Sequence, residues 1–282
     1  MPTAQASDTV AQNPSGVQSH SLMPLLFGPA HLYRAARACM RRGSAPGADG
    51  VTWREYRHEL KPNLAKLSEL LRSGQWRPGP LRVVTIASYT GKQFAIHIPT
   101  AADRIVHQAM HTAIEPILES AAFSPWVAGY RPGRNRIDAV RAAALHVADG
   151  LGAVADIDVA RASAGSSAAE ATEWLAEYVH DGAFLALFRT ALSGLPEPLA
   201  PGSGLAPLLI NLRLSRVDRR LDGLAIVRFA DNYCAFTPDA DAADLAFERV
   251  AAALRAEELA PHPTKSRIRI GANPEDLFLI AG

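Results

Sequence analysis

Hydrophobic and polar positions along the chain change period repeatedly, and the changes mark alternating helices and strands. Apolar residues that recur every three or four positions are typical of amphipathic helices, whereas short alternating or continuous apolar runs indicate strands. The pattern predicts helices near 30–42, 53–73, 101–118, 137 onward, 168–192, 205–221 and 242–259, and strands near 81–86, 93–99, 152–160, 226–236, 265–270 and 277–280. Isolated strands between helices indicate an α+β class with an antiparallel sheet covered on one face.

The strand segment 226–236 contains two short apolar runs joined at Asp231 and Asn232. An Asp-Asn pair tolerates positive φ, so the segment predicts a β-hairpin with the Asp231 carboxylate at its tip. Rigid strands can hold such an oxygen ligand for a divalent cation. The alternative is that Asp-Asn is only a turn.

The strand predicted at 152–160 carries two further carboxylates. Period-two alternation places Asp156 and Asp158 on one face of this strand. Two acids on one face repel each other, and a cation would relieve the repulsion. The alternative is a strand that ends at the surface with both acids solvated.

Composition indicates an ordinary globular protein of one large domain or two packed ones, with 282 residues of which 48% are hydrophobic and 20% charged. Cys39 and Cys234 are far apart, which favours a reducing compartment and a cytoplasmic location over a disulfide framework or a zinc site. No membrane-spanning run is present, so no membrane partner is expected. Residues 1–21, rich in Ser, Gln, Asn and Thr, predict a disordered leader.

Charge is distributed unevenly although the net charge is only +1. Residues 31–142 carry 17 Lys and Arg against 8 Asp and Glu, a net of +9, whereas residues 143–200 carry 2 against 8, a net of −6. This distribution suits a protein that binds a polyanion with its basic half and a metal ion with the acids of its centre. The alternative is that the Arg-rich helices only present solvated charged faces. His107 and His111 have metal-ligand spacing, but packing or surface roles are the expectation for them.

Two loops favour ligand contacts. The basic, aromatic loop 129–135 contains Arg131 and Arg134, which suit phosphate contacts beside a stacked base, with a surface turn as the alternative. The loop 194–204, rich in Pro and Gly, is of a kind that lets backbone approach a ligand or another chain.

In order along the chain, eight segments together resemble the reverse transcriptases of group II introns and their bacterial relatives. They are GADGVT (47–52), LRSGQWRP (71–78), IPTAADRIVHQA (98–109), GYRPGR (129–134), ADID (155–158), GSGLAPLLIN (202–211), the hairpin 226–236, and the closing pair of LAP (259–261) through Lys265-Ser266 and LFL (277–279). The resemblance covers about residue 25 to the end.

The resemblance implies a right-hand polymerase fold, with a fingers-like region at 22–150, a palm-like region at 151–282 and no thumb, which a partner chain would then supply. It implies RNA-directed DNA synthesis on an RNA template and primer, with dNTP substrates and two Mg²⁺ (or Mn²⁺) ions. Asp156 and Asp231 match the metal ligands, and Lys265 matches a lysine thought to protonate the leaving pyrophosphate. Lys92 and Arg104 fall near phosphate-contacting positions, and Gly202 lies in the segment that supports template and nucleotide.

Four departures from the family pattern fall in the same predicted pocket. Asn232 replaces the second carboxylate of the hairpin motif, and Ala160-Arg161 replaces an aromatic pair, so Asn232 and Arg161 join the candidate substrate-binding residues. Ala200-Pro201-Gly202 lacks the usual glutamine, and Phe94 stands where an arginine would meet the triphosphate. Two hypotheses therefore remain: an RNA-directed polymerase, altered or impaired, and an inactive RNA-binding or maturase-like scaffold. A third hypothesis, a palm-type nucleotide cyclase, is less favoured because it gives the fingers-like segments no function.

Overall fold

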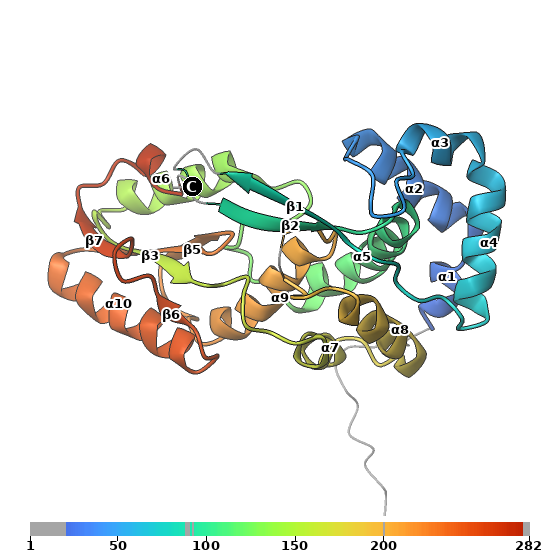
Figure 1. Cartoon of the computed structure of the whole chain (residues 1–282). Coiled ribbons are helices and arrows are strands. Elements are labelled where there is room, and N and C mark those ends of the chain that lie inside the picture. The colour runs from blue at the N-terminus through green and yellow to red at the C-terminus, as the bar shows by residue number, and fades with distance from the viewer. Residues whose placement is uncertain (1–20, 88–90, 92, 200, 279–282) are drawn as a thin grey trace, which may run out of the picture.

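The computed structural model describes residues 21–87, 91, 93–199 and 201–278, and it divides into a helical half and a sheet half (Figure 1). The helical half contains α1 (Met23–Leu26), α2 (Pro29–Arg42), α3 (Trp53–His58), α4 (Leu60–Arg72), α5 (Ala101–Ala121), α7 (Ala168–Ala176) and α8 (Gly182–Ser193). These helices share one apolar core, at the centre of which α5 buries Ile105, Met110 and Ile114 completely. No helix in the described ranges is long and apolar enough to cross a membrane.

Local capping signals explain where several helices begin. Thr52 and Glu55 form a capping box at the start of α3, and Thr100 accepts a hydrogen bond from the Asp103 amide at the start of α5. The predicted helix at 53–73 is interrupted at Glu59, whose backbone (φ −108°, ψ 32°) leaves helical geometry and separates α3 from α4.

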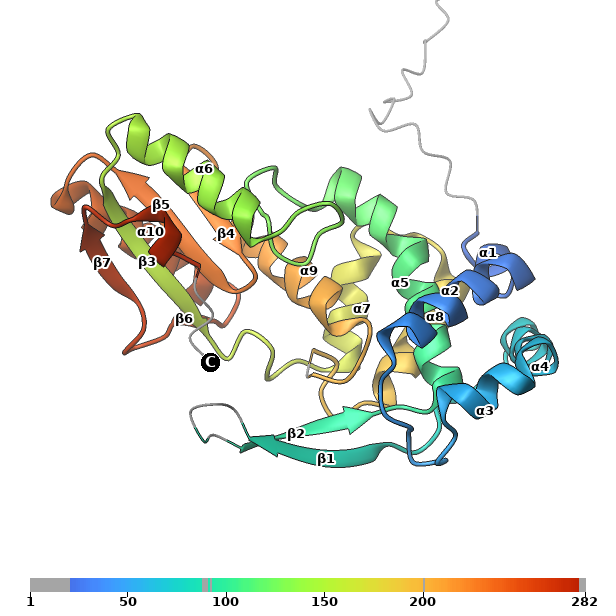
Figure 2. The same ribbon diagram turned by 90° about the horizontal axis from the view of Figure 1, so that it is seen from above.

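A separate two-stranded hairpin joins α4 to α5. Strands β1 (Arg82–Ala87) and β2 (Gln93–Ile98) pair antiparallel, as predicted, with Arg82 opposite Ile98. In Figure 2 this hairpin projects from the helical half. Val83, Ile86 and Phe94 expose apolar surface on it.

The sheet half is built around β3 (Ala153–Ala160). β5 (Asn232–Thr237) pairs with β3 on one side and with β4 (Ile226–Phe229) beyond, while β6 (Ala260–Pro261) and β7 (Arg267–Ile270) pair with β3 on the other side. All these pairings are antiparallel, so the predicted α+β class with an antiparallel sheet is confirmed.

Helices cover both faces of this sheet, whereas the sequence pattern predicted one covered face. α10 (Ala240–Arg255) and α9 (Ala206–Asp218) pack against Ile157, Tyr233 and Ala235, and α6 (Arg136–Ala148) packs against the opposite side chains Val154 and Phe236. Figure 1 shows α6 above the sheet and α10 below it. The prediction was wrong because α6 is weakly amphipathic and contacts the sheet mainly through its alanines.

Two other expectations differ from the structure. The strand predicted at 277–280 begins instead with a turn, because Leu277 and Phe278 follow a 3₁₀ helix (Pro274–Asp276), while 279–280 lie outside the described residues.

The helices after residue 151 divide between the halves: α7 and α8 join the core of the helical half, and α9 and α10 cover the sheet. The predicted boundary at 150/151 therefore does not coincide with the division into halves, because α7 and α8, which follow it, pack into the same core as the helices before it.

Candidate active site

The β4–β5 hairpin holds Asp231 at its tip. The tip residues are Ala230 and Asp231, and Asn232 is already the first residue of β5, opposite Phe229. Positive φ occurs at Ala230 (55°), one position before the predicted Asp-Asn turn. Gly129 packs so closely here that a Cβ on it would lie 2.1 Å from the Ala230 nitrogen, so the loop 129–135 touches the hairpin tip.

A buried polar network fixes this tip from below. Arg228, inside the apolar run of β4, forms an ion pair with Asp218 of α9 at 2.7 Å, and both side chains are fully buried. Arg228 also donates to the Ala230 carbonyl at 2.7 Å and to Asn211 Oδ1 at 2.8 Å, and Tyr233 donates to Asp218 at 2.8 Å. Sequence periodicity does not reveal this network, although a lone arginine within the apolar run Ile226–Phe229 is a signal for a buried ion pair.

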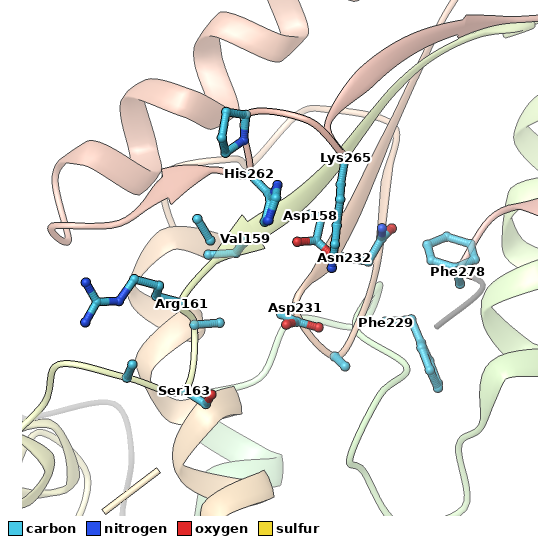
Figure 3. A pocket seen from close by; sticks show the side chains of 15 residues that line it. Asp158, Val159, Arg161, Ser163, Phe229, Asp231, Asn232, His262, Lys265 and Phe278 are labelled. Carbon is cyan, nitrogen blue, oxygen red and sulfur yellow. The ribbon is translucent and has the colours of Figure 1, made fainter. Parts of the chain in front are cut away.

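A cavity of about 500 Å³ opens beside the hairpin tip and contains Asp158, Asp231, Asn232 and Lys265 (Figure 3). Lys265 Nζ lies 3.6 Å from Asp158 Oδ2. The backbone amide of Val159 donates to the Asp231 carbonyl at 3.0 Å, which holds the tip against the end of β3. Two carboxylates and one ammonium group therefore converge on one opening.

Asp156 lies on the same face of β3 as Asp158 but makes different contacts. The registers Asp156 opposite Cys234 and Asp158 opposite Asn232 confirm that the two acids share a face. Asp156 is 5% exposed, forms an ion pair with Arg269 of β7 at 2.8 Å, and accepts a hydrogen bond from Asn232 Nδ2 at 3.3 Å. It does not line the cavity, so the structure brings Asp231 and Lys265 together with Asp158 rather than with Asp156.

Burial raises the pKa of Asp231, and the negative charge of Asp158 raises it further, while the charges of Lys265 and Arg228 oppose these effects. Burial also raises the pKa of Tyr130, with a second contribution from the negative charge of Asp231. A carboxyl group that retains its proton more strongly than usual, inside a cavity, is a feature of functional sites.

The donor set fits one hard divalent cation. Carboxylate oxygens of Asp158 and Asp231 are the ligands that Mg²⁺ prefers. The pair of ions that the resemblance implies would also need Asp156, whose charge is neutralised by Arg269. Within the described ranges, no cluster of three or more His, Cys, Asp or Glu side chains has metal-binding geometry.

The predicted phosphate-contacting arginines lie in different environments. Arg131 is buried and donates to Glu119 and to the carbonyls of Ser124 and Val127. Arg134 donates to the carbonyls of Pro125 and Val127 from an exposed position. Both therefore shape the loop 129–135, and their binding role stays a prediction.

The remaining candidates divide between two cavities. Arg161, with φ 56°, lines the hairpin-tip cavity with Asn232. Arg104 and Gly202 line a second cavity, between α2, α5 and the loop before α9. Lys92 lies outside the described residues. His107 is buried and His111 half-buried, and desolvation lowers the pKa of each to about 4, which agrees with the packing role expected for them.

Comparison with known proteins gives one partial match. Protein YkfC of Escherichia coli (strain K12) is 37% identical over 141 residues, which cover 49% of this chain and 36% of YkfC. No family model matches the chain. The chain thus spans about a third of the length of the curated relative that it matches.

Proposed function

We propose that the chain is a reverse-transcriptase-like nucleotidyltransferase with a right-hand polymerase fold, in which the helical half serves as fingers and the sheet half as palm. The observation that carries this proposal is the hairpin tip, which places Asp231 beside Asp158 and Lys265 in one cavity of an antiparallel sheet. The ordered series of family-like segments supports it, since these segments supply the hairpin, β3 and the loop before α9. RNA template, primer and dNTP are the proposed ligands.

The side chains of the cavity have separable roles in such a reaction. Asp158 and Asp231 would hold Mg²⁺ or Mn²⁺, which when bound polarises phosphoryl oxygens and activates a hydroxyl nucleophile. Lys265, partly exposed and close to Asp158, would deliver a proton to a leaving pyrophosphate. Arg161, which also lines the cavity, would offer a cation to the phosphates.

Primer extension with Mg²⁺ or Mn²⁺ tests the proposal. We expect Asp231→Ala and Asp158→Ala to abolish extension, and Lys265→Met to lower its rate by about 10²–10⁴-fold because a general acid is lost. Asp222→Ala, at an exposed position in the loop before β4, is the matched control and should retain the wild-type rate. Equal extension by wild type and Asp231→Ala would end the proposal.

A second function, an RNA-binding scaffold without turnover, is favoured by a specific observation. Asp156, which the resemblance assigns to metal binding, is in an ion pair with Arg269, and Asn232 supplies an amide in place of a carboxylate. This function predicts RNA binding that is unchanged in Asp156→Ala and Asp231→Ala. Loss of binding in folded forms of these variants, measured by fluorescence anisotropy, would count against it.

A further inference from the structure

Helix α6 packs on the sheet with one face and turns the other face toward solvent. Ala139 and Ala143 are fully buried and belong to the same apolar core as Val154 and Phe236 of the sheet. In Figure 2, which looks onto this side of the molecule, α6 lies in front of the sheet. A helix that covers a sheet from outside ordinarily carries polar side chains on its outer face, because that face meets water.

The outer face of α6 is instead mainly apolar. The helix exposes Ile137, Arg141, Ala144, Leu145 and Ala148, and only Arg141 among them is charged. Ile137 is 58% exposed and Leu145 is 68% exposed. These positions recur every three or four residues, so their side chains form one stripe along the helix. Apolar residues on both faces of a helix are typical of a helix that is buried on both faces.

This apolar stripe is self-complementary about Arg141. Ile137 lies four residues before Arg141 and Leu145 lies four residues after it. Two α6 helices that lie antiparallel about a two-fold axis at Arg141 therefore bring Ile137 of one copy against Leu145 of the other. The same contact is then made twice, as in an isologous interface, in which one patch serves both copies.

The charges of this face also complement themselves in the antiparallel arrangement. Arg141 Nη1 lies 3.6 Å from Asp138 Oδ1, so two copies would form a central cluster of two guanidinium and two carboxylate groups without net charge. Arg134, exposed just before the helix, and Asp149, exposed just after it, are nearly equidistant from Arg141. Antiparallel pairing brings each of them near the opposite charge of the other copy, whereas parallel pairing would bring like charges together.

We propose that the outer face of α6 binds a second copy of this chain, with the two α6 helices antiparallel about Arg141. A second copy is the occupant because both the apolar residues and the charges of the face match the face itself. One pair of 13-residue helices is smaller than a standard stable interface, so we expect a dimer that dissociates on dilution. No residue of α6 lines the hairpin-tip cavity, and the proposal does not depend on nucleotidyl transfer there.

Analytical ultracentrifugation of the full chain over a range of concentrations tests the dimer. Leu145→Glu should weaken association about tenfold or more, because it buries an unpaired carboxylate in the apolar contact. Leu245→Glu on α10, where the leucine is 74% exposed, is the matched control and should associate as wild type does. Both substitutions are at exposed positions, so both variants should keep the circular dichroism of wild type. A wild-type chain that stays monomeric would assign the face to a different partner and overturn the proposal, as would equal association of the two variants.

Disulfide trapping tests the antiparallel register. Cys39 and Cys234 are buried, so a thiol added on α6 is the exposed one. We expect a disulfide-linked dimer when the Ile137→Cys and Leu145→Cys variants are mixed and oxidised, and none when either is oxidised alone. In each variant alone the two thiols would lie about 12 Å apart along the helices, beyond the reach of a disulfide. A mixture that stays unlinked, or variants that link only with themselves, would overturn the proposal.

Discussion

Asp231 combines a half-buried position, a raised pKa and a place in the hairpin-tip cavity. Its neighbours Asp158 and Lys265 act on it in opposite directions, so its protonation depends on the tertiary arrangement of β3 and the hairpin. The protonation of Asp231 therefore responds to pH and to bound cations, so a measurement of its titration is the most direct test of the site.

The pH dependence of stability should reveal Asp231 in the absence of divalent cations. Because its folded-state pKa is raised above the unfolded value, the folded state binds more protons between the two values, and the free energy of unfolding falls as pH rises through that window. Asp231→Asn removes this loss, so its stability relative to wild type should increase as the pH rises above about 4, the ordinary pKa of an aspartate. Urea unfolding at several pH values measures it, with Asp222→Asn as the exposed control. A difference between Asp231→Asn and wild type that does not vary with pH would contradict the prediction.

Gly202 illustrates a second residue whose identity the fold requires. Its φ is 122°, and a Cβ would lie 2.1 Å from the His97 carbonyl oxygen. Gly202→Ala should therefore lower the free energy of unfolding by at least about 1–3 kcal/mol. Gly204→Ala is the matched control, because its Cβ would meet only the His107 side chain at 3.9 Å. Equal denaturant midpoints for the two variants would show that the backbone at 202 relaxes freely.

Among the elements, the contact between α9 and the β4–β5 hairpin positions the candidate site. Asp218 and Asn211 of α9 reach Arg228 and Tyr233 on the two strands, so a helix from one side of the sheet holds the hairpin tip. Sequence periodicity predicted both the helix and the hairpin but not this link, because hydrogen bonds between residues 10–17 positions apart leave no periodic trace.

Breaking this link should be costly. Arg228→Met leaves the Asp218 carboxylate buried and unpaired, which is expected to destabilise the protein by about 3–5 kcal/mol. The double variant Arg228→Met with Asp218→Leu should be more stable than the single variant, since no charge is then left alone. Arg255→Met, which removes an exposed ion pair with Glu248, should cost less than about 1 kcal/mol in the same urea experiment. A double variant no more stable than Arg228→Met would refute this account of the pair.

Across the whole molecule, part of the basic charge counted between residues 31 and 142 lies on exposed arginines of the helical half. Arg37, Arg41 and Arg57 surround a small hollow on α2 and α3, and within the described residues none of them forms an ion pair. The α7 and α8 helices, which carry Glu170 and Glu173 against Arg189, pack into the same half.

Salt dependence of RNA binding tests this distribution. If Arg37 and Arg41 contact phosphates, changing both to Ala should weaken binding of all sequences similarly and reduce the slope of log K against log salt by about 1 per residue. Arg189→Ala, on the exposed side of α8, is the matched control and should leave the slope unchanged. An unchanged slope in the Arg37 and Arg41 variant would show that these arginines form only a solvated face.

The sequence by itself determined the elements, because helix period, strand alternation and caps such as Thr100 with Asp103 depend on neighbours a few residues away. It also determined that Asp156 and Asp158 share a face and that Asp231 sits near a hairpin tip. Only the tertiary structure decided that Asp158, rather than Asp156, opens into the cavity. That choice depends on Arg269, which β7 brings alongside β3 from more than a hundred residues away in the sequence, and such long-range pairing is not encoded in any local pattern.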